Sequence, residues 1–164
     1  MKVGIISDSH DSRKNVLRAV KVFGKRGVEY VFHAGDIVSP AIVAVLGGVE
    51  GAKFIGVYGN CDYERGQLAA VIGNFGGEIY EGAYRGQVGG KRVLMSHQLE
   101  VPERTAENGQ YDLVIYGHTH RLDVRRVGGT LMVNPGRSGG GLMKKATVVI
   151  VELDGMEAED VVLK

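Results

Sequence analysis

Seven side chains in five short segments of the chain carry oxygen or nitrogen donors of the types that bind metal ions. Four of the five histidines belong to this set, together with two aspartates and one asparagine. The set consists of Asp8, His10, Asp36, Asn60, His97, His118 and His120. A structural zinc ion takes four protein ligands, so seven donors exceed the need of one such site. Two divalent ions that share a bridging carboxylate account for the number, because carboxylate and amide oxygens suit Mn²⁺ and imidazoles also accept iron or zinc.

Each donor segment follows a run of strand-forming residues. The five runs are residues 2–7 (KVGIIS), 28–32 (VEYVF), 54–58 (FIGVY), 91–95 (KRVLM) and 112–116 (DLVIY). In an open α/β sheet, ligands bind outside the carboxyl ends of the strands, so we expect the five loops to meet at one edge. Asp8 and His10 are two residues apart, as are His118 and His120. In an extended backbone this spacing points both members of a pair the same way, toward the same site.

The segments between the first strands predict crossover helices. Val16, Val20 and Phe23 have helical spacing, and Ser39-Pro40 is typical of the first residues of a second helix. A third helix is expected over about residues 64–75. The second half predicts hairpins instead, with glycine pairs at residues 89–90 and 128–129 and a closing hairpin of residues 146–153 and 157–163. We therefore expect an α/β fold with mixed sheets, in a single domain of residues 1–164.

The composition excludes some classes of binding partner and indicates a cellular compartment. The charged residues nearly cancel to a net charge of +1, so strong electrostatic binding of nucleic acid is not expected. The apolar runs are of strand length, far short of the ~20 residues that cross a bilayer, so no membrane partner is expected. Cys61 is the only cysteine, which excludes an internal disulfide and fits a reducing compartment. We expect a cytoplasmic protein, and a homodimer is an open alternative to a monomer.

The order and spelling of these segments resemble those of a known family. D-x-H, G-D, G-N-x-D, S-H and G-H-x-H follow one another as in the calcineurin-like metallophosphoesterase superfamily, and GDIVS, GNCD and YGHTH resemble its small archaeal and bacterial phosphodiesterases. The resemblance implies a four-layer α/β/β/α sandwich with two mixed sheets. It also implies two divalent ions, with Mn²⁺ expected first and Ni²⁺, Fe²⁺ or Zn²⁺ as alternatives. Asp8, His10, Asp36 and His120 would hold one ion, and Asp36, Asn60, His97 and His118 the other, with Asp36 as the bridge.

The resemblance further implies hydrolysis of a small phosphodiester by a hydroxide that bridges the two ions. Asp36, Asn60 and His97 are the expected catalytic residues. Two positions depart from the family pattern: Cys61 stands where many members have a histidine that protonates the leaving group, and Ser96 replaces a Gly or Thr before His97. The first departure favours diesters over monoesters, because a thiol is a poorer acid for this task than an imidazole. A phosphomonoesterase and a catalytically weak scaffold, like the retromer subunit of this fold, are the alternatives.

Several other polar residues have simpler interpretations. His33 lies within a strand-like run and is expected to be a hydrogen-bonded core residue. Asp62 is left without a role beyond orienting a neighbour. Arg65, Arg121 and Arg137 are candidates for binding substrate phosphate. The glycines of residues 139–141 lack the Lys and Ser or Thr of a P-loop, so a turn is expected there.

Overall fold

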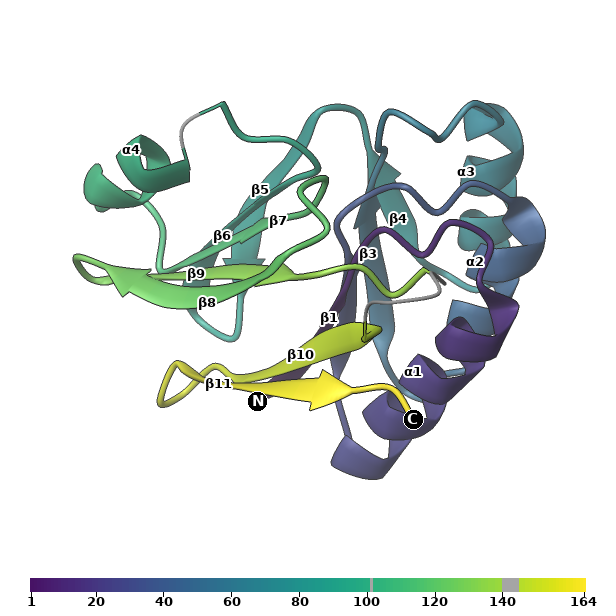
Figure 1. Ribbon diagram of the computed structural model, residues 1–164, viewed down its shortest axis with the longest axis horizontal. Helices are drawn as coiled ribbons and strands as arrows, with labels where there is room; N and C mark the ends of the chain where they lie inside the picture. Colours follow the sequence, from purple (N-terminus) through teal and green to yellow (C-terminus); the bar gives the residue numbers. More distant parts are fainter. Residues whose placement is uncertain (101, 140–144) are drawn as a thin grey trace.

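The computed structural model describes residues 1–100, 102–139 and 145–164, and in these residues the strands form two mixed sheets (Figure 1). The first sheet has the order β11-β10-β1-β2-β3-β4. Its parallel strands are β1 (Lys2–Ile6), β2 (Tyr30–His33), β3 (Lys53–Val57) and β4 (Glu78–Tyr80). β10 (Thr147–Glu152) pairs antiparallel with β1, and β11 (Glu157–Val162) pairs antiparallel with β10. The predicted closing hairpin is thereby confirmed.

The second sheet has the order β5-β6-β7-β9-β8. Its strands are β5 (Ala83–Val88), β6 (Lys91–Ser96), β7 (Leu113–Tyr116), β8 (Leu122–Val127) and β9 (Thr130–Pro135). β6, β7 and β9 run parallel, whereas β5 and β8 pair antiparallel at the two edges. Gly89 and Gly90 join β5 to β6, both at positive φ, which a side chain would disfavour. The two glycine pairs therefore form the hairpin turns that the sequence predicts.

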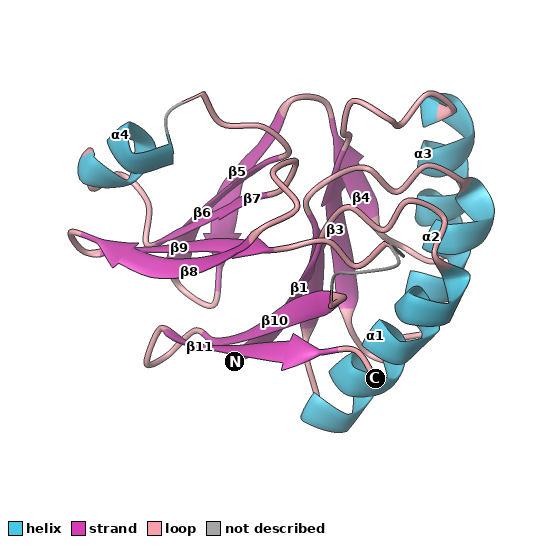
Figure 2. Cartoon of the chain, in the orientation of Figure 1, coloured by secondary structure: helices cyan, strands magenta, loops and turns pink. Residues whose placement is uncertain are grey.

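Helices cover the outer faces of both sheets (Figure 2). α1 (Arg13–Arg26), α2 (Pro40–Leu46) and α3 (Arg65–Asn74) lie on the first sheet. α4 (Pro102–Glu107) lies on the second, where Ala106 packs against Leu94, Val114 and Met132. This arrangement is the four-layer α/β/β/α sandwich. Within the described residues, no helix combines the length and apolar character needed to cross a membrane.

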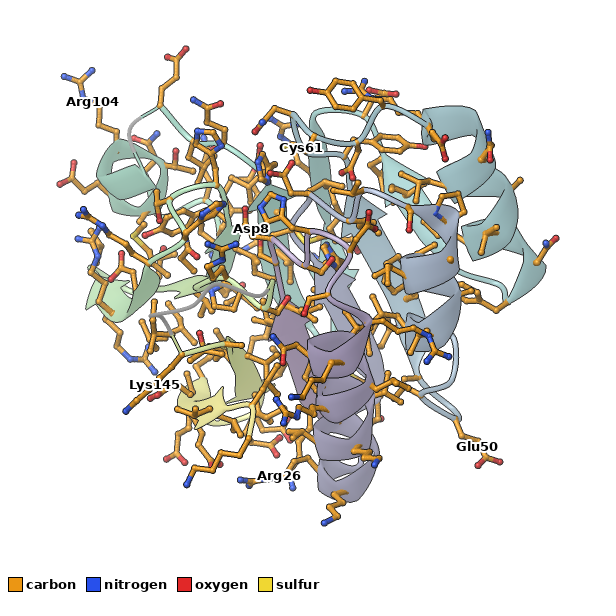
Figure 3. All side chains as sticks on the ribbon, turned by 45° about the vertical axis from the view of Figure 1, so that its right-hand side comes forward. Asp8, Arg26, Glu50, Cys61, Arg104 and Lys145 are labelled. Carbon is orange, nitrogen blue, oxygen red and sulfur yellow. The ribbon has the colours of Figure 1, made fainter. Side chains whose placement is uncertain are left out.

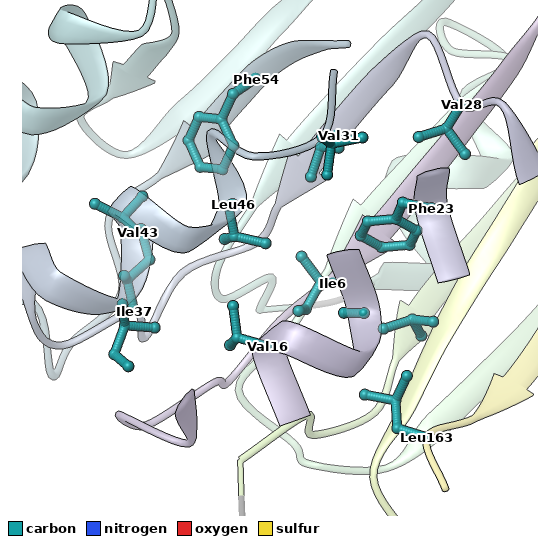
Figure 4. Packing of buried hydrophobic residues seen from close by; sticks show 14 of the residues in the cluster. Ile6, Val16, Phe23, Val28, Val31, Ile37, Val43, Leu46, Phe54 and Leu163 are labelled. Carbon is teal, nitrogen blue, oxygen red and sulfur yellow. The ribbon is translucent and has the colours of Figure 1, made fainter. Parts of the chain in front are cut away.

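The core consists of apolar layers on either side of the first sheet. Val3 and Ile5 point toward Met95 and Ile115 of the second sheet, and all four side chains are fully buried. Ile6 and Val31 face the helices and contact the layer that includes Phe23 (Figure 4). Strands buried on both faces read as continuous apolar runs, which is why these segments are easy to find in the sequence. The rigid core fixes where each strand ends, and so places the loops that carry the donors.

Two elements have no counterpart in the sequence-based expectations. β4 has three residues and includes the exposed Glu78, and the six-residue α4 lacks a long apolar period. β2 also begins at Tyr30, two residues later than expected. Short elements bury little surface of their own, so tertiary packing rather than local pattern decides them. The turn expected at residues 139–141 lies outside the described residues except for Gly139.

Candidate metal centre

The five donor loops meet at one edge of the sandwich. They follow β1, β2, β3, β6 and β7, which are parallel strands of the two facing sheets. Figure 3 shows Asp8 and Cys61 in this region, with Arg26 at the far end of α1. The structure brings all seven predicted donor residues together here, in two groups.

The first group consists of Asp8, His10, Asp36 and His120. One donor atom from each residue lies within 4.8 Å of the other three. His10 Nε2 is 3.1 Å from His120 Nε2 and 3.6 Å from Asp36 Oδ2. His120 Nε2 is 3.2 Å from Asp8 Oδ1. Four donors thus face one small volume.

The second group consists of Asp36, Asn60, His97 and His118. Asn60 Oδ1 lies 3.0 Å from His97 Nε2 and 3.0 Å from His118 Nδ1. His97 Nε2 is also 3.5 Å from Asp36 Oδ1. Asp36 therefore belongs to both groups, with Oδ2 toward His10 and Oδ1 toward His97.

The polar atoms of these groups are poorly matched to one another without a cation. Asp8 Oδ1 is buried and has no hydrogen-bond partner among the described residues. His97 Nδ1 lies 2.8 Å from the Ala34 carbonyl oxygen, which can only accept, so the ring proton of neutral His97 is on Nδ1. Its Nε2 lone pair then faces the oxygens of Asp36 and Asn60. A divalent cation would satisfy these acceptors together, so the donor set fits the metal that the sequence predicts.

The loops reach the centre through backbone that L residues rarely adopt. Asp8, His10, Asp36, His118 and His120 all have positive φ values, between 39° and 66°. The expectation that each D-x-H or H-x-H pair lies on extended backbone is therefore wrong, although the side chains do reach the centre. His118 and His120 reach different groups. Such strain persists where the surroundings hold it, and it is concentrated at functional sites.

Glycines let the loops approach one another closely. A Cβ on Gly59 would lie 2.2 Å from Asp36 Oδ1, and one on Gly117 would lie 2.1 Å from Ser7 Oγ. A Cβ on Gly35 would lie 2.6 Å from His97 Nδ1. The glycines that precede Asp36 and Asn60 therefore make room for a donor of another loop, and the glycine that precedes His118 makes room for the Ser7 hydroxyl that binds Asp8.

Asp62 is a site residue whose role the sequence left open. Its buried carboxylate accepts hydrogen bonds from the backbone N–H groups of Asp36 (3.0 Å), Val38 (2.7 Å) and Gly59 (2.7 Å). Val38 is β-branched and has a φ of 81°, which is a strained conformation. Asp62 thus holds the Asp36 loop against the Asn60 loop. The signal in the sequence is its place as the last residue of the G-N-x-D segment.

Ser7 restrains the other buried carboxylate. Ser7 Oγ donates to Asp8 Oδ2 at 2.5 Å, and the His118 N–H donates to the same oxygen at 3.2 Å. These donors occupy Oδ2 and leave Oδ1 directed at His120. No sequence pattern around Ser7 distinguished it from an ordinary strand residue.

The protonation of nearby groups follows from burial and neighbouring charges. Burial lowers the pKa of His33 to about 3, and its Nε2 lies 3.1 Å from Ser9 Oγ, so it is the hydrogen-bonded core residue that was predicted. Burial also lowers the pKa of His120, which favours the neutral imidazole that binds metals. Desolvation and the nearby Asp36 raise the pKa of the Cys61 thiol. Cys61 therefore stays protonated at neutral pH.

The three arginines differ in their relation to the centre. Arg65 borders a cavity that also contacts Asn60 and His97. The charge of Arg137 contributes to lowering the pKa of His120, which places Arg137 beside the first group. Arg121 has a backbone hydrogen bond to Thr119 Oγ1 and an exposed side chain.

Comparison with known proteins gives a consistent result. Residues 1–156 match the family model of the calcineurin-like phosphoesterase superfamily domain. A phosphodiesterase of Methanocaldococcus jannaschii is 33% identical over 167 residues, which cover 100% of both chains. The phosphodiesterase YfcE of Escherichia coli is 28% identical over 149 residues, which cover 83% of this chain and 78% of YfcE. The solved structure of an archaeal phosphodiesterase superposes with a TM-score of 0.92 at 32% identity, over 99% of this chain and 100% of the other.

Proposed function

Because the chain belongs to the calcineurin-like phosphoesterase superfamily, we propose that it is a metal-dependent phosphodiesterase with a binuclear centre. One observation carries the proposal: seven donors from five loops converge in two groups, and both groups include Asp36. The relatives named as phosphodiesterases support the reaction class. We take residues 1–164 as one metallophosphoesterase domain.

The donor geometry supports a specific assignment of ligands. Asp8, His10, Asp36 and His120 would hold one ion, and Asp36, Asn60, His97 and His118 would hold the other. Asn60 offers a neutral amide oxygen, which limits the negative charge that the centre presents to an anionic phosphate. The orphaned Asp8 Oδ1 and the tautomer of His97 favour bound cations over a network of hydrogen bonds within the protein.

When bound, a pair of divalent cations stabilises the charge on the phosphoryl oxygens and lowers the pKa of a water molecule toward neutrality. The chain itself keeps the donors in place. Asp62 ties the Asp36 loop to the Asn60 loop, and Ser7 directs Asp8. The Ala34 carbonyl fixes the His97 ring with Nε2 toward Asn60. This preorganisation spares the site reorganisation during the reaction.

Cys61 favours diesters over monoesters. Its N–H donates to Asp36 Oδ1 at 2.8 Å, so the residue lies directly at the centre. Its thiol has a raised pKa and is a weak proton donor to a leaving alkoxide. Diesters with weakly basic leaving groups depend least on such a donor. A monoesterase, with a more charged substrate, is the second candidate function, and an eroded scaffold is disfavoured by the complete donor set.

The test combines elemental analysis with an activity screen. Purified protein should bind about two equivalents of divalent metal and release nitrophenolate from bis(p-nitrophenyl) phosphate faster than from p-nitrophenyl phosphate, with Mn²⁺ the best activator. Faster hydrolysis of the monoester would favour the monoesterase. If neither ester is hydrolysed and no metal is bound, the non-catalytic scaffold would be the remaining function. Manganese, a homodimer and a cytoplasmic location remain predictions from the sequence.

A further inference from the structure

Two cavities extend from the metal centre across the second sheet. The near cavity, of about 390 Å³, is bordered by Asn60 and His97 of the second donor group and by Tyr58, Arg65 and Gln98. The far cavity, of about 820 Å³, lies between β5, β6 and α4. The two cavities share Glu81, Gly82, Ser96 and Gln98. They therefore form one groove that begins at the metal centre.

Ser96 lies at the passage between the two cavities. Ser96 Oγ lies 3.1 Å from the carbonyl oxygen of Gly82 and 3.1 Å from that of Gln98. Its one proton is donated to one of these carbonyls at a time, so Ser96 lies between the turn that joins β4 to β5 and the loop that follows His97. Ser96 is one of the two positions that depart from the family pattern, and its hydroxyl has a structural use here.

The near cavity is polar and electrically balanced. Arg65 Nη1 is paired with Glu81 at 2.7 Å, its Nε donates to the Asp62 carbonyl oxygen at 3.1 Å, and its guanidinium lies 5.0 Å from the centre of the Tyr58 ring. Glu81 compensates the arginine charge and its carboxylate would repel a second phosphate, so this wall is a poor site for one. An uncharged group that hydrogen-bonds, and that lies along an aromatic side chain, fits it better.

The far cavity combines an apolar floor with polar walls. Leu94, Leu99 and Tyr111 belong to the cluster beneath α4 and also border this cavity. Arg85 and Asn108 add hydrogen-bond donors. The apolar floor can pack against a flat ring, and the polar walls can form hydrogen bonds with the edges of that ring.

We propose that the groove binds the second ester substituent of the substrate, and that this substituent has the size and polarity of a nucleoside. The inference rests on the proposed phosphodiesterase function and deepens it. A phosphoryl group held at Asn60 and His97 would lie at the mouth of the groove, so the substituent that a diester keeps after the leaving group departs can extend into it. A methyl ester leaves almost all of the near cavity empty. Gln98 borders both cavities and is the specificity residue of the groove.

The experiment compares two diesters that release the same leaving group. With Mn²⁺, kcat/KM for thymidine 5′-(p-nitrophenyl phosphate) should exceed that for methyl p-nitrophenyl phosphate about ten-fold or more. The variant Gln98→Ala should lower this ratio about ten-fold. The matched control is Gln87→Ala, an exposed glutamine of β5 that borders neither cavity of the groove, and it should keep the wild-type ratio.

A binding measurement separates the groove from the reaction. Equilibrium dialysis of metal-loaded protein with thymidine 5′-(methyl phosphate) should give a Kd about ten-fold higher for Gln98→Ala than for wild type or Gln87→Ala. Equal kcat/KM for the two esters would overturn the proposal that the groove binds the second substituent. An equal loss of kcat/KM for both esters in Gln98→Ala would overturn it as well. Failure to cleave either ester would instead overturn the phosphodiesterase, and an unchanged Kd in Gln98→Ala would then overturn the groove as well.

Discussion

His10 Nε2 and His120 Nε2 lie 3.1 Å apart, although 110 positions separate the two residues in the chain. A single shared proton could bridge two neutral imidazoles at this distance. Asp8 Oδ1 is 3.2 Å from His120 Nε2 and Asp36 Oδ2 is 3.6 Å from His10 Nε2, so two carboxylate oxygens face the same point. Asp8, His10, Asp36 and His120 would hold a cation here, and it would supply, in place of one proton, a charge that all four donors could share.

Removing one of these imidazoles should empty one half of the centre. His120→Ala should lower bound metal by about one equivalent, because the second donor group keeps Asp36, Asn60, His97 and His118. His97→Ala is the matched variant in the other group and should also lose about one equivalent. Elemental analysis of the dialysed proteins gives both values. Full occupancy in His120→Ala would remove this residue from the ligand set.

Asp36→Asn should affect both halves at once. An amide keeps the shape of the side chain but has only one oxygen. It therefore cannot direct one oxygen toward His10 and another toward His97, as the carboxylate does. Activity on bis(p-nitrophenyl) phosphate should fall at least about 10³-fold, and metal content should drop below one equivalent. Asp160→Asn, an exposed carboxylate on β11, is the control. Turnover near the wild-type level in Asp36→Asn would exclude a bridging role.

The convergence of the donors could be predicted because it depends on strand ends. Parallel strands such as β1, β2 and β3 are short, nearly continuous apolar runs, and the polar residues after them must leave the sheet at the same edge. The glycine pairs marked the hairpins equally well, since Gly89 and Gly90 both require positive φ. These features are local in the chain, which is why the sequence alone reveals them.

The detailed contacts could not be predicted because they join loops distant in the chain. The Asp62 carboxylate accepts hydrogen bonds from the backbone N–H groups of Val38 and Asp36. No local sequence pattern indicates which N–H groups a carboxylate will bind. The positive φ of His118 and His120 sends the two rings to different groups, which extended-strand reasoning could not foresee. The groove at Gln98 also needs α4, whose short sequence carries little helical signal.

Asp62 should matter for stability even without metal. Asp62→Ala leaves three buried or half-buried backbone N–H groups without their acceptor, and each such loss is worth about 1–3 kcal/mol. The free energy of unfolding of the metal-free protein should therefore fall by at least about 3 kcal/mol in urea titrations. Asp62→Asn keeps one acceptor oxygen and should lose less. A change below about 1 kcal/mol in Asp62→Ala would mean that water replaces the carboxylate.

His33 should make the fold sensitive to acid. Its pKa is about 3 in the folded protein and near 6.5 when unfolded, so between these values only the unfolded chain binds the proton. The contribution of His33 to the free energy of unfolding is fully present above about pH 6.5. It falls as the pH drops below this value, by up to about 1.4 kcal/mol per pH unit. Urea unfolding of metal-free protein at pH 7 and pH 5 measures the loss. His33→Asn, which lacks the titrating ring, should show a smaller loss, and equal losses would contradict the assignment.

Cys61 tests which proton donor the reaction needs. Cys61→His places an imidazole, with a pKa near neutrality, beside Asp36 where the thiol now lies. Hydrolysis of p-nitrophenyl phosphate should then rise relative to bis(p-nitrophenyl) phosphate by about ten-fold or more, because a positioned acid typically contributes 10²–10⁴-fold. Cys61→Ala is the control, and it should keep diester turnover within about two-fold, since a protonated thiol contributes little as a nucleophile or an acid. A collapse of diester turnover in Cys61→Ala would make the thiol itself part of the reaction.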